Sequence, residues 1–155
     1  MAARVFVDAN VLLRFYFSEP GHHRECTALL EKLKGKGVEL WISGQVIREF
    51  YVQATRTQYF PDPNNIDDII RIVEALPLFF HIVDESREAR ELLPSLLLKY
   101  QVRKLLTHDA NHLAMMLAND IDIICTLDSN FEDFSDRVNI LSPLAEDARK
   151  SEDSG

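Results

Sequence analysis

Short runs of β-branched and aromatic residues alternate along this chain with segments of helical periodicity, and this alternation restricts the fold more than any other feature. Residues 4–7 form the first apolar run, and the apolar residues of 11–16 then recur at helical spacing. Further strands are predicted at 38–42, 81–83, 121–126 and 138–141, and helices at 22–34, 45–57, 66–76, 86–100 and 107–119. This order predicts an α/β fold, a three-layer α/β/α sandwich with a central, mainly parallel sheet.

Three segments depart from the pattern. Pro94 lies inside the helix predicted at 86–100 and is expected to kink or split it. Residues 61–65 favour a loop by composition. The residues from 146 to 155 are polar and small, so we expect a single domain over 1–145 followed by a disordered tail.

The composition is that of one globular domain, because 155 residues with 46% hydrophobic content suffice for a single core. No apolar run approaches the roughly 20 residues that cross a membrane, and the first residues lack the apolar stretch of a secretory signal. We therefore expect a cytoplasmic protein without a membrane segment. Cys26 and Cys125 lie in apolar stretches without metal-ligand spacing, which favours buried free thiols over a disulfide.

The formal net charge of -8 comes from 25 acidic against 17 basic residues. Such an excess weakens any function in which the whole surface grips nucleic acid by neutralising phosphates. If the protein binds RNA, the contact must be local.

Two aspartates, Asp8 and Asp128, directly follow apolar strands. Because ligands of parallel α/β sheets bind at the carboxyl ends of the strands, both side chains would project at the same edge, where they could be neighbours. The alternative is that each caps a helix or occupies a turn, two places where aspartate is also favoured.

Two further acids lie at the borders of helical apolar faces. Glu49 stands beside the inner stripe of the helix 45–57, although a solvated surface glutamate is the commoner reason for such a position. Asp109 falls in the first turn of the helix 107–119, where the helix dipole alone would favour a carboxylate. Neither residue indicates a site by itself.

Together the four acids indicate a cation site. Two unit charges about 4 Å apart repel by about 4 kcal/mol at an effective dielectric of about 20, so such a cluster needs protons or cations. Carboxylate oxygens are hard ligands that suit Mg²⁺ or Mn²⁺.

The motifs around these acids resemble those of the PIN-domain nucleases. The segment 7–13 (Val-Asp-Ala-Asn-Val-Leu-Leu) is similar to the opening motif of that family. The later acidic motifs follow in the family's order at 46–50, 108–114 and 126–131, and the resemblance covers roughly residues 4–142.

The resemblance implies a PIN-like fold and a metal-dependent endoribonuclease in which an ion activates the attacking water. Metal-binding acids of the family match Asp8, Glu49, Asp109 and Asp128, and its supporting polar groups match Asn10 and Thr126. All six are expected to serve catalysis. Asn130 stands where relatives often carry another acid, and the loss of that ligand would favour a site for one ion.

Basic residues and histidines near the acids are further candidates for the site. Five basic residues are candidates for phosphate contacts: Arg14, Arg48, Arg56, Arg103 and Lys104. Arg14 and Lys104 are the better candidates because they are close in sequence to the acids. His108 and His112 have the i, i+4 spacing of metal ligands, but no third histidine or HExxH pattern accompanies them, so zinc is not expected.

Two other functions remain open. An aspartate-nucleophile phosphatase would also place an acid after the first strand, but it usually requires a second aspartate where this chain has Asn10. A catalytically silent PIN-like module that binds RNA or protein is the main alternative, because fold does not fix function.

Within the family, the resemblance is closest to the compact VapC-type toxin ribonucleases of toxin-antitoxin pairs. It implies an RNA substrate, a small antitoxin protein as partner and a homodimer. Neither the target RNA nor its cleavage site follows from the sequence.

Overall fold

The computed structural model describes residues 2–56, 59–60 and 65–144. Its strands are β1 (Arg4–Val7), β2 (Glu39–Ser43), β3 (His81–Val83), β4 (Ile123–Cys125) and β5 (Asn139–Leu141). They form one sheet in the order β3-β2-β1-β4-β5, and every neighbouring pair is parallel. The predicted parallel sheet is therefore confirmed.

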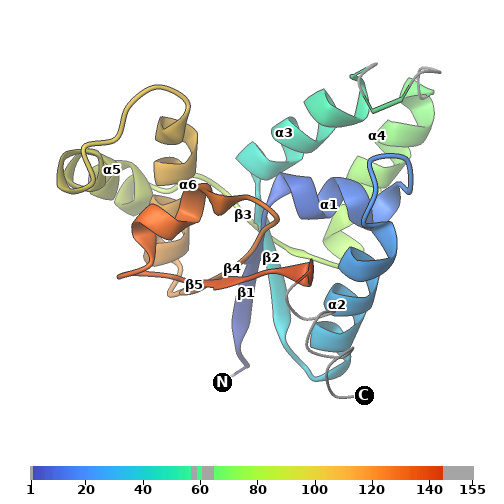
Figure 1. The fold of residues 1–155 in the computed structure, drawn as a ribbon, viewed down its shortest axis with the longest axis horizontal. Helices are drawn as coiled ribbons and strands as arrows, with labels where there is room; N and C mark the ends of the chain where they lie inside the picture. Colours follow the sequence, from blue (N-terminus) through green and yellow to red (C-terminus); the bar gives the residue numbers. More distant parts are fainter. Residues whose placement is uncertain (1, 57–58, 61–64, 145–155) are drawn as a thin grey trace.

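Helices cover both faces of this sheet. They are α1 (Ala9–Tyr16), α2 (His23–Gly35), α3 (Gly44–Ala54), α4 (Ile66–Ala75), α5 (Arg87–Lys99) and α6 (Leu106–Ala118), with short 3-10 helices η1 (Leu76–Leu78) and η2 (Ser129–Phe134). Figure 1 shows α1, α2 and α4 on one side of the strands and α5 and α6 on the other, which is the expected three-layer arrangement.

The strand order reverses between β1 and β4. From the central β1 the chain adds β2 and β3 on one side, and then crosses over to add β4 and β5 on the other. Sheets of this kind bind ligands in the crevice outside the carboxyl ends of the strands at such a switch point. The residues that follow β1 and β4 are therefore placed where a site is expected.

The core is built around the central strand. Val5, Phe6 and Val7 of β1 are all buried, as required of a strand covered on both faces, whereas Asn139 and Ile140 of the edge strand β5 are exposed. Cys26 and Cys125 are buried free thiols, as predicted. Within the described ranges, no helix is long and apolar enough to cross a membrane.

The prediction that Pro94 splits its helix is wrong. Pro94 lies inside the continuous helix α5, although it lacks the N–H that would bond to the carbonyl of Arg90. Tertiary packing outweighs this local cost, because α5 packs along α6 and buries Ala89 and Leu96.

The strand predicted at 121–126 is shorter than expected. Asp120 has a left-handed backbone (φ 55°), and Ile121 N donates to Met116 O, so these residues close α6 before β4 starts at Ile123. The 3-10 helix η2 was not predicted, and it buries Phe131 and Phe134, which are three residues apart as its period requires. The expected tail at 146–155 and most of the loop at 61–65 lie outside the described residues.

Candidate active site

Asp8 connects the first strand to the first helix and is buried, with 6% of its surface exposed. One of its oxygens, Oδ1, accepts a hydrogen bond from Ala9 N at 2.8 Å, so Asp8 is the N-cap of α1. The other oxygen, Oδ2, accepts from Thr126 Oγ1 at 2.8 Å. Asp8 is thus both a helix cap and a residue of the candidate site, so these two interpretations of Asp8 do not exclude each other.

Thr126 joins the ends of β1 and β4. Its hydroxyl donates to Asp8 and accepts from Asn10 Nδ2 at 3.3 Å and from Asp128 N at 3.0 Å. Asn10 Oδ1 in turn accepts from Leu127 N at 3.2 Å. Because Thr126 is 1% exposed, this network fixes the backbone on which Asp8 and Asp128 stand.

Glu49 is brought to the same edge by α3, which begins directly after β2 with Ser43 as its N-cap. Both of its oxygens are engaged. Oε1 accepts from Gln45 Nε2 at 2.9 Å, and Oε2 lies 3.2 Å from His112 Nε2. Gln45 Oε1 accepts from Asn111 Nδ2 at 2.6 Å, so α6 holds the α3 carboxylate from two positions.

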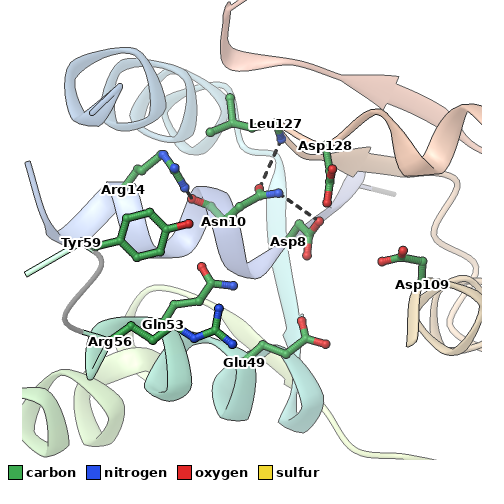
Figure 2. A pocket seen from close by; sticks show the side chains of 10 residues that line it. All are labelled: Asp8, Asn10, Arg14, Glu49, Gln53, Arg56, Tyr59, Asp109, Leu127 and Asp128. Carbon is green, nitrogen blue, oxygen red and sulfur yellow. Dashed lines mark hydrogen bonds between the residues drawn. The ribbon is translucent and has the colours of Figure 1, made fainter. Parts of the chain in front are cut away.

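Asp109 and Asp128 complete the group of acids. Asn130 Nδ2 lies 3.4 Å from one carboxylate oxygen of each, and so bridges the start of α6 and the residues after β4. All four predicted acids line one pocket of about 360 Å³, together with Asn10. Figure 2 shows their side chains around the mouth of this pocket. The structure thus brings the four predicted acids from separate segments to one pocket, and their role as metal ligands stays a prediction.

Partial burial and the neighbouring carboxylates raise the pKa of Asp109. Partial burial raises it most, and the carboxylates of Asp8 and Asp128 add to the effect, giving a pKa of about 6. Burial also raises the pKa of Asp8, although His112 and the Thr126 hydroxyl oppose the shift. The carboxylate end of the pocket therefore lacks a balancing positive charge, and a cation would supply it.

The pKa values of Glu49 and His112 shift in the directions expected of an ion pair. Burial opposes ionisation of both, but the hydrogen bond between them keeps the pKa of Glu49 below its usual value and the pKa of His112 above its own. Since His112 is 1% exposed, the pair is shielded from solvent at the histidine end.

The donor set fits a hard divalent cation. Oxygens of Asp8 and Glu49 and His112 Nε2 lie within 4.8 Å of one another. A metal-bound histidine almost always donates its second ring N–H to an acceptor, yet His112 Nδ1 is buried without a partner in the part of the chain that the structure describes. We therefore assign His112 as the donor that positions Glu49, and leave the carboxylates as the ligand atoms.

Sequence reasoning missed several residues of the site. His112 was considered only as part of a zinc pair with His108, and neither Gln45 nor Asn111 was considered at all. The available signal was helical spacing, because Met115 and Met116 follow His112 at i+3 and i+4, and all three are buried in α6. Of the basic residues named as candidates for phosphate contacts, Arg14 and Arg56 line the pocket and Lys104 does not.

A doubly wound parallel sheet with acidic residues gathered at its switch point defines an α/β protein with a candidate cation site. The sequence model described as "PIN domain" matches residues 5–137. The chain therefore belongs to the PIN-domain family, as the motifs predicted.

Related proteins agree with this assignment. "Ribonuclease VapC13" of Mycobacterium tuberculosis is 28% identical over 134 residues, which is 84% of this chain and 94% of the relative. The structure of VapC20 from the same species, described as a sarcin-ricin loop cleaving toxin, has a TM-score of 0.62 at 16% identity over 83% of this chain and 92% of its own. A toxin-antitoxin complex from Klebsiella pneumoniae has a TM-score of 0.62 at 22% identity, covering 90% and 97%. These two structures show the same fold.

Proposed function

We propose that this protein is a metal-dependent endoribonuclease of the toxin type, which hydrolyses phosphodiester bonds in RNA. The observation that carries the proposal is the convergence of four carboxylates from four segments on one pocket, with the pKa of Asp109 raised to about 6. The carboxylate end of this pocket repels an anionic substrate until a cation occupies it. RNA as the substrate class is supported by the related ribonuclease VapC13.

Each residue has a separate task in this proposal. Asp8, Glu49, Asp109 and Asp128 would hold Mg²⁺ or Mn²⁺, which when bound lowers the pKa of water and stabilises charge on phosphate oxygens. Thr126 and Asn10 orient Asp8 and the loop after β4 through the hydrogen bonds described above. No side chain needs to act as nucleophile.

We further propose a small antitoxin protein as partner and a homodimer as the assembly. The similar structure from Klebsiella pneumoniae, which is a toxin-antitoxin complex, supports the antitoxin partner.

Two large apolar side chains near the connection of α5 and α6 support the homodimer, since Leu98 is 72% and Leu105 is 80% exposed. Light scattering coupled to size-exclusion chromatography measures the mass in solution, and the double variant Leu98→Lys, Leu105→Lys should be a monomer.

We also propose a cytoplasmic location, which agrees with the two free cysteines.

The decisive experiment is cleavage of a mixed-sequence single-stranded RNA with Mg²⁺ or Mn²⁺. Wild type should cut, EDTA should stop the reaction, and Asp8→Asn should lower the rate by on the order of 10²–10³-fold, the scale of losing one charge-stabilising group. Asp136→Asn is a matched control, because Asp136 pairs with Lys99 and Tyr100 away from the pocket.

Intact RNA in every lane, with folded protein and several substrates, would reject the enzyme. The silent PIN-like binding module would then be the better function for this chain.

A further inference from the structure

The pocket continues beyond the carboxylates into a wall of different chemistry. Arg14, Gln53, Arg56 and Tyr59 line this end of the pocket. In Figure 2 the side chains of Arg14, Tyr59 and Arg56 lie on the side opposite Asp109 and Asp128, with Asn10 and Glu49 between the two groups. One pocket therefore has an acidic end and a basic, aromatic end.

Arg14 is held in place by two uncharged partners. Its Nη1 donates to the backbone carbonyl of Asn10 at 2.9 Å, and its guanidinium carbon lies 5.9 Å from the centre of the Tyr59 ring. Its Nε is buried and has no hydrogen-bond acceptor in the described ranges. Neither the carbonyl nor the ring neutralises the guanidinium, so Arg14 keeps a full positive charge for a ligand.

Arg56 adds a second positive charge from the end of α3. It is exposed, and over residues 2–56, 59–60 and 65–144 neither Arg56 nor Arg14 forms an ion pair with a carboxylate. In a chain with a net charge of -8, two unpaired guanidinium groups on one wall of a pocket stand out against the acidic background. Arginine is also the side chain best suited to phosphate recognition.

Tyr59 supplies a flat surface beside these charges. Its side chain is half-buried and lines the pocket next to Arg14. Nucleobases stack on such rings in proteins that bind single strands, where a basic groove follows the backbone. A base that is paired in a duplex offers no free face, and a pocket of about 360 Å³ is small.

We infer that this wall is the binding site for the nucleotide next to the scissile phosphate, with Arg14 and Arg56 on its phosphate and Tyr59 stacked on its unpaired base. The inference rests on the proposed ribonuclease function and adds that the cut lies in single-stranded RNA. An acidic peptide would use the two arginines, but it would not use the aromatic face or explain the adjoining carboxylates.

Binding of a fluorescein-labelled single-stranded RNA tests the inference apart from cleavage. All variants are made in an Asp8→Asn background so that the RNA stays intact. Arg56→Ala and Arg14→Gln should each weaken binding by about 10–100-fold, the scale of a charge-assisted hydrogen bond. Each should also lower the salt dependence of the affinity by about 0.7 in log-log slope. Arg90→Ala on α5 removes an exposed charge that does not line the pocket, and its affinity should stay within about twofold of the Asp8→Asn background.

The base contact is tested with Tyr59→Phe and Tyr59→Ala. The phenyl ring should preserve affinity, and alanine should lower it by about 5–150-fold, the range for one stacked base. An RNA that lacks the matching base (an abasic nucleotide) should bind the Tyr59→Ala variant as tightly as the intact RNA does, because the stacking contact is already lost. If removing the ring and removing the base lower the affinity additively, the two do not stack and that contact is overturned.

The result separates the two proposals. Cleavage by wild type together with unchanged RNA affinity of Arg56→Ala and Tyr59→Ala would overturn the subsite and leave the ribonuclease standing. Arginine-dependent and Tyr59-dependent binding without any cleavage would reject the enzyme and the placement beside a scissile phosphate, and would leave a wall that binds single-stranded RNA. Arg56-dependent binding of oligoglutamate, with RNA affinity independent of Arg56, would overturn the subsite in favour of an acidic protein partner.

Discussion

His112 Nε2 lies 3.2 Å from Glu49 Oε2, and this buried contact ties α6 to α3 across the carboxylate pocket. The imidazole is 1% exposed and packs against the rings of Phe6 and Phe131, with ring centres 5.5 and 6.3 Å away. Because the ring cannot turn freely in this packing, it fixes the direction from which Glu49 enters the pocket.

His112→Phe should therefore weaken metal binding more than it changes the fold. Phenylalanine fills a similar volume but donates no hydrogen bond, so Glu49 loses one of its two partners. Loss of such an outer partner typically lowers metal affinity or activity by about 10–100-fold. The destabilisation should be about 1–3 kcal/mol, the cost of an unpaired, partly buried group. Manganese titration of cleavage measures the first effect, and urea unfolding measures the second.

His108→Ala is the control for this prediction, because His108 is an exposed histidine one turn earlier on the same helix. A manganese dependence that is equal in His112→Phe and wild type would show that His112 serves packing alone.

The pKa of about 6 for Asp109 predicts a pH-dependent metal affinity. Near pH 6 about half of the metal-free molecules carry the proton, and a cation must displace it, so affinity should rise with pH up to about 7 and then level off. Calorimetry of Mg²⁺ binding in two buffers of different ionisation enthalpy measures the protons released. Asp109→Asn should abolish most of this release, and an unchanged release in that variant would contradict the assignment.

The same shifts predict that the metal-free protein loses stability as the pH rises. A raised pKa means that the folded state holds its proton more tightly than the unfolded chain does. For Asp109 the contribution is complete below about 3.8 and is lost as the pH rises through about 6. His112 acts in the same direction above 6.5, because its pKa is also raised. The Tm in EDTA should fall between pH 5 and 8, and Mg²⁺ should restore it most at pH 8.

Thr126→Val should damage both stability and cleavage. Valine cannot donate to Asp8 or accept from the Asp128 N–H, so the buried Asp8 carboxylate and the Asp128 N–H each lose a partner, at a cost of about 1–3 kcal/mol. Thr126→Ser keeps the hydroxyl and loses only a buried methyl, at about 1 kcal/mol. Cleavage near the wild-type rate in Thr126→Ser, and a loss of tenfold or more in Thr126→Val, is the expected result. Equal losses would mean that the hydroxyl does not orient Asp8.

The sequence predicted those site residues whose positions follow from backbone rules. Asp8, Thr126 and Asp128 each lie at or just beyond the end of a parallel strand, and β1 and β4 are neighbours at the switch point. Their proximity therefore follows once the strands are recognised. The apolar stripe of α3 likewise placed Glu49 at the border of the buried face.

Contacts between side chains from distant segments could not be predicted in this way. His112 meets Glu49 across 63 positions of sequence, and Tyr59 meets Arg14 across 45. Nothing in the local pattern around His112 says which carboxylate it will face, since its i, i+4 partner His108 points to a different interpretation. Pro94 shows that a local rule can also fail. Proline disfavours the interior of a helix, yet α5 continues through Pro94 because it packs against α6.

Asn130→Asp would place an acid where the family resemblance implies one, and it should make the fold depend on metal. Asn130 Nδ2 now lies 3.4 Å from both Asp109 and Asp128, so a carboxylate there would replace a donor by a third negative charge. The metal-free Tm should fall and the pKa of Asp109 should rise further. Calorimetry should show tighter Mg²⁺ binding or a second ion per chain. Asn130→Ala removes the donor without adding charge, and should lower the metal-free Tm less and leave the stoichiometry unchanged. Equal metal binding in the two variants would show that position 130 does not contribute to the ion site.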